Sequence, residues 1–196
     1  MFDSIRALLD TLAVSFDLPI LDWIMANIWC PALDVAMPII TVLGDAGIFW
    51  IAVSVLFMIT KKYRKTGIGM MLALLMGLVV CNIWLKPAVA RIRPYDFQME
   101  YFQKEIALLA GAMHDFSFPS GHTIASFEAA VVILLNHKKL GIGAMILAVL
   151  IAFSRLYLYV HYPPDVLVSI VLGTAFAFIG NFLAQKIMDK LPAKLK

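Results

Sequence analysis

Charged side chains are scarce in this sequence: Asp, Glu, Lys and Arg make up 15% of its 196 residues, whereas hydrophobic residues make up 62%. An ordinary soluble domain is about 45–50% apolar. A soluble fold of this length has no core large enough to bury the excess, and the mean hydropathy of +0.89 agrees with this. The composition therefore excludes an ordinary soluble domain. It predicts an all-α, polytopic membrane helix bundle that forms one domain over residues 1–196.

Cysteine is also rare. Cys30 and Cys81 stand in apolar surroundings, with neither the spacing of a metal site nor a disulfide framework. We expect both to be buried as small hydrophobic residues.

The first residues, "MFDSIRALLDTLAVSF", lack the basic start and the small-residue cleavage site of a signal peptide. They predict instead an amphipathic helix that lies at a membrane interface.

Apolar segments of about the length of a membrane span follow one another along the chain. Residues 18–43 are harder to interpret, because this apolar stretch contains Asp22, Asp34, Pro31 and Pro38. It is either a broken first span or a pair of interfacial helices, and we expect a sixth span there. The other five expected spans are 46–60, 67–86, 121–136, 140–160 and 164–186.

Basic residues gather in the link 60–66, in the turn 136–140 and in the C-terminal tail. If each segment crosses once, all three places face the same side, which the positive-inside rule makes cytoplasmic. Arg6 joins them if 18–43 crosses. The cytoplasmic set is then Lys61, Lys62, Arg64, Lys65, Lys138, Lys139, Lys186, Lys190, Lys194 and Lys196. Lys86, Arg91, Arg93, Lys104 and Arg155 fall on the opposite side, where basic residues need another explanation.

Three short stretches bring polar residues to that opposite side. "KPAVARIRP" ends one expected span, "PSGH" begins the next, and "SRLYLYVHYPPD" joins the last two. In the expected topology all three stretches meet at one membrane face. They supply Lys86, Arg93, Ser120, Gly121, His122, Arg155, His161 and Asp165.

The cations among these residues predict an anion site. Lys86, Arg93 and Arg155 would be costly near lipid without an anion. A phosphate would satisfy them well, because arginine offers forked hydrogen bonds to its oxygens. The Ser120 hydroxyl and the free N–H groups at the helix start after Gly121 add further donors and a favourable dipole.

The two histidines favour phosphate transfer over mere binding. One imidazole can attack phosphorus while the other protonates the leaving oxygen. Asp165 follows His161 by four residues and begins the last helix, because Pro163 and Pro164 suit a first helical turn. Its carboxylate could hold the His161 ring, which would leave the other ring nitrogen free to attack. His122 would then be the acid.

Together the stretches resemble the type 2 phosphatidic acid phosphatase superfamily of membrane lipid phosphatases. The chain shows Lys86-x6-Arg93-Pro94, Pro119-Ser120-Gly121-His122 and Ser154-Arg155-x5-His161-x3-Asp165 within the motif-bearing region 86–165. The resemblance implies a helical membrane fold, commonly of six spans, and hydrolysis of a phosphate monoester or diphosphate without metal or cofactor. It implies His161 as the nucleophile that forms a phosphohistidine, Asp165 as its orienting partner and His122 as the acid. It assigns the phosphate oxygens to Lys86, Arg93, Ser120, Gly121 and Arg155.

The resemblance also implies a lipid substrate and a cellular location. A small chain of this kind is similar to undecaprenyl diphosphate phosphatases of the bacterial plasma membrane, with the site facing outside. Phosphatidylglycerophosphate and phosphatidic acid phosphatases share the same motifs and stay as alternatives. The expected partners are the bilayer and the lipid substrate, not nucleic acid.

Other functions remain open from the residues alone. His161 and Asp165 could bind zinc, although zinc needs three or four convergent ligands and the nearby cations would repel it. A protein that binds or transports phospholipids would use the same cations. Intact His122, His161 and Asp165 argue against it, because binding needs no nucleophile or acid. Phosphate transfer to an acceptor lipid is a further alternative.

Glu128 lies in the middle of an expected span, where ionisable groups are rare. It follows His122 by six residues, roughly 120° around a helix. We interpret it as a structural hydrogen-bonding group, with lipid binding or an oligomer contact as alternatives. His114 is interpreted as a loop residue and His137 as part of a cytoplasmic turn.

Overall fold

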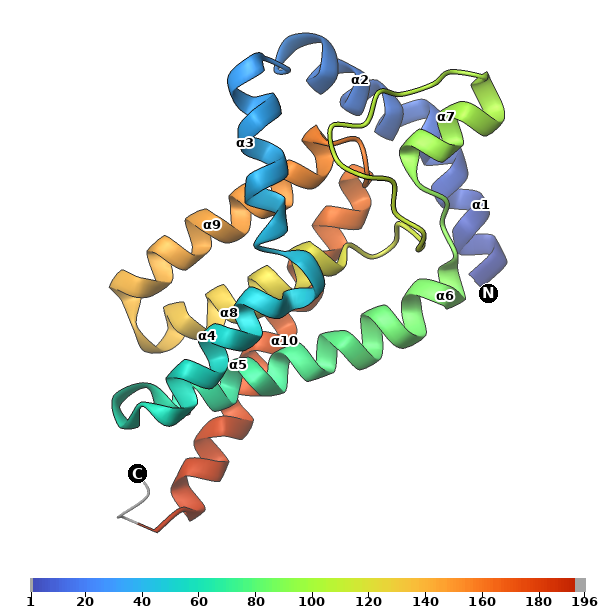
Figure 1. The fold of residues 1–196 in the computed structure, drawn as a ribbon. Coiled ribbons are helices and arrows are strands. Elements are labelled where there is room, and N and C mark those ends of the chain that lie inside the picture. The colour runs from blue at the N-terminus through green and yellow to red at the C-terminus, as the bar shows by residue number, and fades with distance from the viewer. Residues whose placement is uncertain (1, 193–196) are drawn as a thin grey trace.

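The computed structural model describes residues 2–192, and every regular element in that range is a helix (Figure 1). The predicted all-α fold is therefore confirmed. The elements are α1 (Phe2–Leu12), η1 (Ala13–Asp17), α2 (Leu18–Asn27), α3 (Pro31–Val42), η2 (Asp45–Gly47), α4 (Ile48–Ile59), η3 (Lys61–Tyr63), α5 (Arg64–Gly77), η4 (Leu78–Leu85), α6 (Lys86–Val89), α7 (Pro94–Phe102), α8 (Gly121–Asn136), α9 (Lys138–Tyr157) and α10 (Pro163–Lys190). Proline begins α3, α7 and α10, where its missing N–H has no intrahelical partner to lose.

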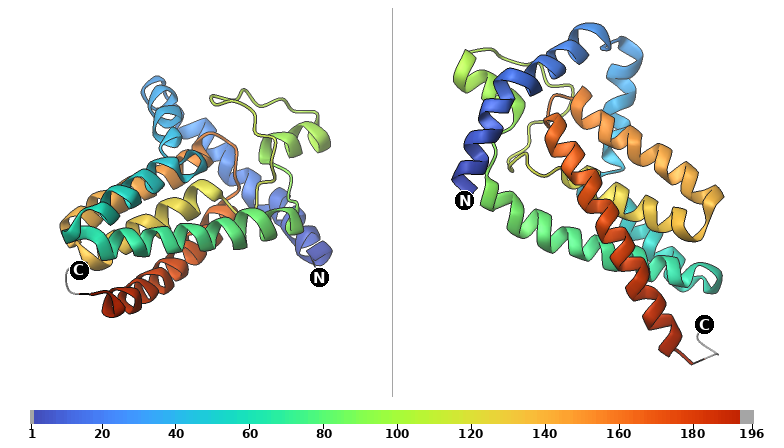
Figure 2. Two further views of the ribbon diagram at one scale, coloured as in Figure 1. Left: turned by 60° about the horizontal axis from the view of Figure 1, so that its bottom comes forward. Right: turned by 180° about the vertical axis from the view of Figure 1, so that it is seen from behind.

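Helix α8 forms the centre of the bundle and packs against α4, α5, α9 and α10 (Figures 1 and 2). Small residues let these helices approach closely. A Cβ added at Gly173 of α10 would lie 2.9 Å from the carbonyl oxygen of Ile124 in α8. The buried face of α8 also includes Ala129 and Ala130, neither of which is exposed.

Three helical stretches are long and apolar enough to cross a membrane, namely Lys61–Phe102, α9 and α10. A fourth crossing results if α3 and the helical stretch Asp45–Ile59, which are bent by 40° at a short break, are counted together. Helix α8 is apolar but shorter, with 16 residues. Among the described residues, length and composition therefore do not confirm the predicted count of six spans.

The expected sixth span at 18–43 is divided in the structure. Helix α2 ends at Asn27, Cys30 is extended, and α3 starts anew at Pro31. A residue before proline is pushed out of the helical region, which explains the break. The prediction that Cys30 is buried is wrong, because this break leaves it exposed, whereas Cys81 is buried as expected.

The N-terminal segment is helical, as predicted. Elements α1, η1 and α2 run as one helical path across the end of the bundle at which α6 and α7 lie (Figures 1 and 2). Arg6 in α1 donates a hydrogen bond from Nε to the carbonyl oxygen of Val89 in α6, at 2.8 Å. Arg6 therefore does not join the predicted cytoplasmic residues, since α6 and the link after α4 lie at opposite ends.

The basic segments do share one end of the bundle. The α4–α5 link, the α8–α9 turn and the last turns of α10 lie together (Figure 1). We call this the basic end, and the end that holds α6, α7 and the α9–α10 loop the site end. Lys194 and Lys196 lie outside the described residues.

Candidate active site

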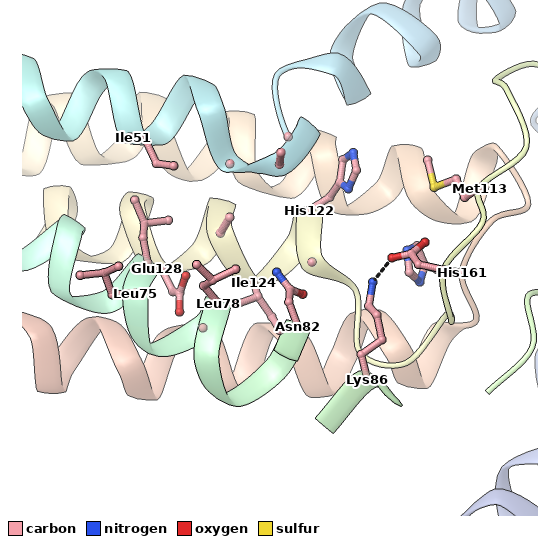
Figure 3. Close-up of a pocket in the computed structure, with 18 of the residues that line it drawn as sticks. Ile51, Leu75, Leu78, Asn82, Lys86, Met113, His122, Ile124, Glu128 and His161 are labelled. Carbon is pink, nitrogen blue, oxygen red and sulfur yellow. Dashed lines mark hydrogen bonds and ion pairs between the residues drawn. The ribbon is translucent and has the colours of Figure 1, made fainter. Parts of the chain in front are cut away.

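A cavity of about 410 Å³ lies between α4, α5, η4 and α8 and reaches the site end (Figure 3). Figure 3 shows Lys86, His122 and His161 at one end of this cavity and Leu75 and Glu128 toward the other. Five of the eight predicted site residues line it, and they are Lys86, Arg93, Gly121, His122 and His161. Ser120, Arg155 and Asp165 lie behind its wall.

The predicted residues come together because each lies at or next to a helix end. Arg93 is the N-cap of α7, and Ser120 is the N-cap of α8. Arg155 lies in the last turn of α9, and Asp165 lies in the first turn of α10. His161 belongs to the short loop between these last two helices. The site thus gathers helix ends that are distant in the sequence.

His161 is buried, and its two ring nitrogens face different partners. Nε2 lies 3.3 Å from Nη1 of Arg93, and Nδ1 lies 3.5 Å from Oδ2 of Asp165. Arginine can only donate, so Nε2 carries the lone pair and Nδ1 carries the proton. Burial lowers the pKa of His161 well below its usual value, and the charges of Arg93 and Arg155 lower it further. Nε2 therefore offers an unprotonated nitrogen beside the cations.

Asp165 is held mainly by partners other than His161. Its Oδ1 accepts a hydrogen bond from Nη1 of Arg91 at 2.8 Å, and its Oδ2 accepts one from the N–H of Tyr162 at 3.0 Å. Its contact with His161 is longer than an ordinary hydrogen bond. The sequence predicts Arg91 on the same side of the membrane as the site residues, but no motif assigns it a role. Its position two residues before Arg93, within the same short stretch, is the one sequence feature that could have suggested a role near the site.

His122 has a carboxylate partner that the sequence analysis missed. Its Nε2 lies 2.6 Å from Oδ1 of Asp45 in η2. Asp45 is half-exposed, and the His122 ring borders the cavity (Figure 3). Gly44 makes room for this ring, because a Cβ added there would lie 2.7 Å from Cδ2 of His122. The pair joins two segments separated by 77 residues, so no local pattern reveals it.

Asp115 stands among the cations where a phosphate is expected. Its carboxylate is bound by Lys86 Nζ at 2.5 Å and by the Arg93 guanidinium. Burial raises the pKa of Asp115, but the hydrogen bonds and charges of Lys86 and Arg93 outweigh this, so the pKa lies below its usual value. The side chain is 54% exposed. A substrate phosphate must therefore displace this carboxylate or share its cations.

Arg155 and Ser120 form hydrogen bonds with other residues of the protein. Arg155 is buried and donates from Nη1 to Oγ1 of Thr41 at 2.5 Å and from Nη2 to Sδ of Met113, which lines the cavity, at 3.0 Å. The N–H of Ser120 donates to Oγ of Ser169 at 2.8 Å. This N–H, which lies at the start of α8, is therefore already occupied.

The remainder of the cavity is apolar, apart from Asn82 and Glu128. Ile51, Leu74 and Leu78 line it there. Glu128 is 1% exposed and lies against Gly77, and its Oε1 has no hydrogen-bond partner. The carboxyl lies in the apolar part of the cavity and not among the cations (Figure 3).

A helical membrane bundle that gathers two histidines and several cations beside an apolar cavity suits an anionic lipid headgroup. The sequence comparison agrees with this class: residues 66–188 match the family model of the PAP2 superfamily. The chain belongs to that superfamily, and the resemblance drawn from the three motifs is confirmed.

One protein of similar sequence and two solved structures illustrate the relationship. An undecaprenyl-diphosphatase of Sulfolobus acidocaldarius is 34% identical over 132 residues, which are 67% of this chain and 61% of that protein. The crystal structure of Aquifex aeolicus LpxE matches with a TM-score of 0.69 at 26% identity, over 84% of this chain and 93% of that one. The crystal structure of a PAP2-type phosphatidylglycerolphosphate phosphatase from Bacillus subtilis matches with a TM-score of 0.64 at 25% identity. This match covers 94% of this chain and 88% of that one. The chain thus spans about three fifths of the Sulfolobus relative.

Proposed function

We propose that the protein is an integral membrane lipid phosphatase that acts through a phosphohistidine intermediate. The observation that carries the proposal is the buried His161 ring, whose Nε2 faces Arg93 at 3.3 Å beside a cavity that is apolar further in. A phosphate at the cations would lie beside this nitrogen, and a lipid tail would lie along the apolar wall. Membership in the PAP2 superfamily and the phosphatase names of its relatives support the same chemistry.

The reaction follows from these positions in two steps. Nε2 of His161 forms a bond to phosphorus while the bond from phosphorus to the leaving oxygen breaks. His122 gives that oxygen a proton. Water then attacks the phosphohistidine, His122 takes a proton from it, and phosphate leaves with His161 restored. Asp45, whose Oδ1 lies 2.6 Å from Nε2 of His122, orients that ring, and Asp165 stabilises the positive charge on His161.

The phosphate oxygens are assigned to Lys86, Arg93 and Arg155, with Ser120 and Gly121 at the start of α8. Lys86 and Arg93 already hold the carboxylate of Asp115, which supports their ability to bind an anion here. Arg155 reaches the cavity wall through Met113. Negative charge that builds on the phosphate in the transition state would be stabilised by these fixed cations.

The substrate that we propose is undecaprenyl diphosphate, which would be converted to undecaprenyl phosphate. The similarity to the Sulfolobus undecaprenyl-diphosphatase supports it. Phosphatidylglycerophosphate is the second candidate, because the Bacillus subtilis phosphatase covers 94% of this chain in structure. Phosphatidic acid is a third lipid to compare.

Phosphate release by the purified protein tests the function directly. In detergent with EDTA present, we expect release from undecaprenyl diphosphate to exceed that from phosphatidylglycerophosphate and phosphatidic acid, with no loss caused by EDTA. Mass spectrometry of the products separates hydrolysis from transfer to an acceptor lipid. Stoichiometric binding of lipid without turnover on any of the three would favour a binding or transport protein instead.

We further propose that the protein lies in the cell membrane with the site end outside. The shared basic end supports this orientation through the positive-inside rule. In intact cells, an impermeant maleimide is expected to label Glu100→Cys in α7 and to leave Lys139→Cys in α9 unlabelled. Both variants should carry Cys30→Ser, because the native thiol is exposed. Opened membranes should label both, and labelling of Lys139→Cys in intact cells would reverse the orientation.

A further inference from the structure

Arg91 lies behind the site and joins two carboxylates from distant parts of the chain. It donates from Nη1 to Oδ1 of Asp165 at 2.8 Å and from Nη2 to Oδ2 of Asp17 at 2.6 Å. None of these three side chains is exposed. Nη2 also donates to the carbonyl oxygen of Leu9 at 2.9 Å, and the guanidinium carbon lies 3.6 Å from the centre of the Tyr162 ring. The N-terminal helical path is thereby tied to the carboxylate beside His161.

Asp17 lies at an irregular point of the N-terminal helical path. The residues Ala13–Asp17 form the π-helical turn η1 between α1 and α2. Such turns widen a helix and are frequent at functional sites. Both Ala13 and Asp17 are buried. Asp17 lies outside residues 66–188, so the part of the chain that matches the family model does not include it.

The charges of this cluster do not cancel. Arg91 paired with Asp165 alone would be neutral, and a structural contact would need no more than that pair. Asp17 adds a second negative charge at 2.6 Å from the guanidinium. Burial raises the pKa of Asp17 above its usual value, and the hydrogen bond and charge of Arg91 offset this only in part. A second buried carboxylate is costly, so its presence calls for a role beyond packing.

We propose that Asp17 is a positioning residue for the phosphatase reaction, acting through Arg91 on Asp165. It holds the guanidinium in place and offsets its charge, so that Asp165 keeps its attraction for the positive charge that develops on His161. The inference rests on the proposed function, because it assigns His161 as the nucleophile. It makes the N-terminal helical path part of the active site and not only an interfacial anchor.

Asp17→Asn tests this, because it removes the charge and keeps the shape. We expect kcat to fall roughly 10- to 100-fold, the range for partners that orient a reacting group, with KM unchanged. Rapid-quench measurements should show the loss in phosphohistidine formation. Asp189→Asn is the matched control: it removes the same charge from the last turn of α10, at the basic end, and should retain wild-type kcat.

A wild-type kcat in folded Asp17→Asn, with only a lower melting temperature, would overturn the proposal and leave a structural contact. If Asp17→Asn does not fold, Asp17→Glu and Asp17→Gln give the same comparison, since they are similar in length and differ in charge. The Glu variant should then be the faster one, and equal rates would contradict the inference. Failure of the wild-type protein to hydrolyse any lipid would instead refute the proposed function.

Discussion

His161→Ala is expected to reduce lipid phosphate release by at least about 10⁴-fold, because removal of a nucleophile abolishes the covalent route. The Nε2 atom that faces Arg93 has no substitute within the described part of the site, where the other histidine, His122, is paired with Asp45. Phosphate release in detergent measures the effect. With a lipid substrate labelled with ³²P in the transferred phosphate, the wild-type protein should retain the label as phosphohistidine after rapid quenching at alkaline pH. The variant should retain none.

A matched control separates loss of chemistry from loss of folding. His137→Ala removes the same side chain at the basic end, where Nε2 lies 3.1 Å from Oγ1 of Thr66, far from the cavity. It should retain wild-type release. His161→Ala should still bind vanadate or phosphate, because Lys86 and Arg93 remain. Substantial release by a folded His161→Ala variant would exclude this residue as the nucleophile.

The site was more predictable than the span count, and helix ends explain the difference. Lys86, Ser120, Arg155 and Asp165 each stand where an apolar segment begins or ends, so counting crossings was enough to bring them to one face. Their placement also depends little on exact helix boundaries. The membrane count, by contrast, depends on whether a break such as that before Pro31 separates two spans or bends one, and hydropathy is similar in both cases.

The partners of the motif residues escaped prediction for a different reason. Asp45 meets His122 and Asp17 meets Arg91 across 77 and 74 residues. Neither carboxylate belongs to a spaced motif, and Asp17 lies at the end of the π-helical turn η1. The position of Asp115 between Lys86 and Arg93 likewise depends on the loop after α7 folding back over the cations. Such contacts are set by tertiary structure and leave no periodic signal.

His122→Asn is expected to slow lipid hydrolysis by about 10²–10⁴-fold, the usual contribution of a positioned general acid. The loss should depend on the leaving group. Phosphatidylglycerophosphate and phosphatidic acid release an alkoxide oxygen that needs a proton. In contrast, p-nitrophenyl phosphate releases a phenolate and a lipid diphosphate releases a phosphate, and both are stable without one. Formation of the phosphohistidine from the aryl phosphate should therefore be slowed much less than formation from these lipid monoesters.

The comparison of both substrates distinguishes an acid from a residue that only shapes the cavity. His114→Asn, an exposed loop change outside the cavity wall, is the control and should leave both rates unaltered. Equal slowing of phosphohistidine formation from lipid and aryl phosphate in His122→Asn would contradict proton donation, because a packing defect does not sense the leaving group. A selective loss would instead tie the Asp45–His122 pair to the step in which the lipid departs, since Oδ1 of Asp45 lies 2.6 Å from Nε2 of His122.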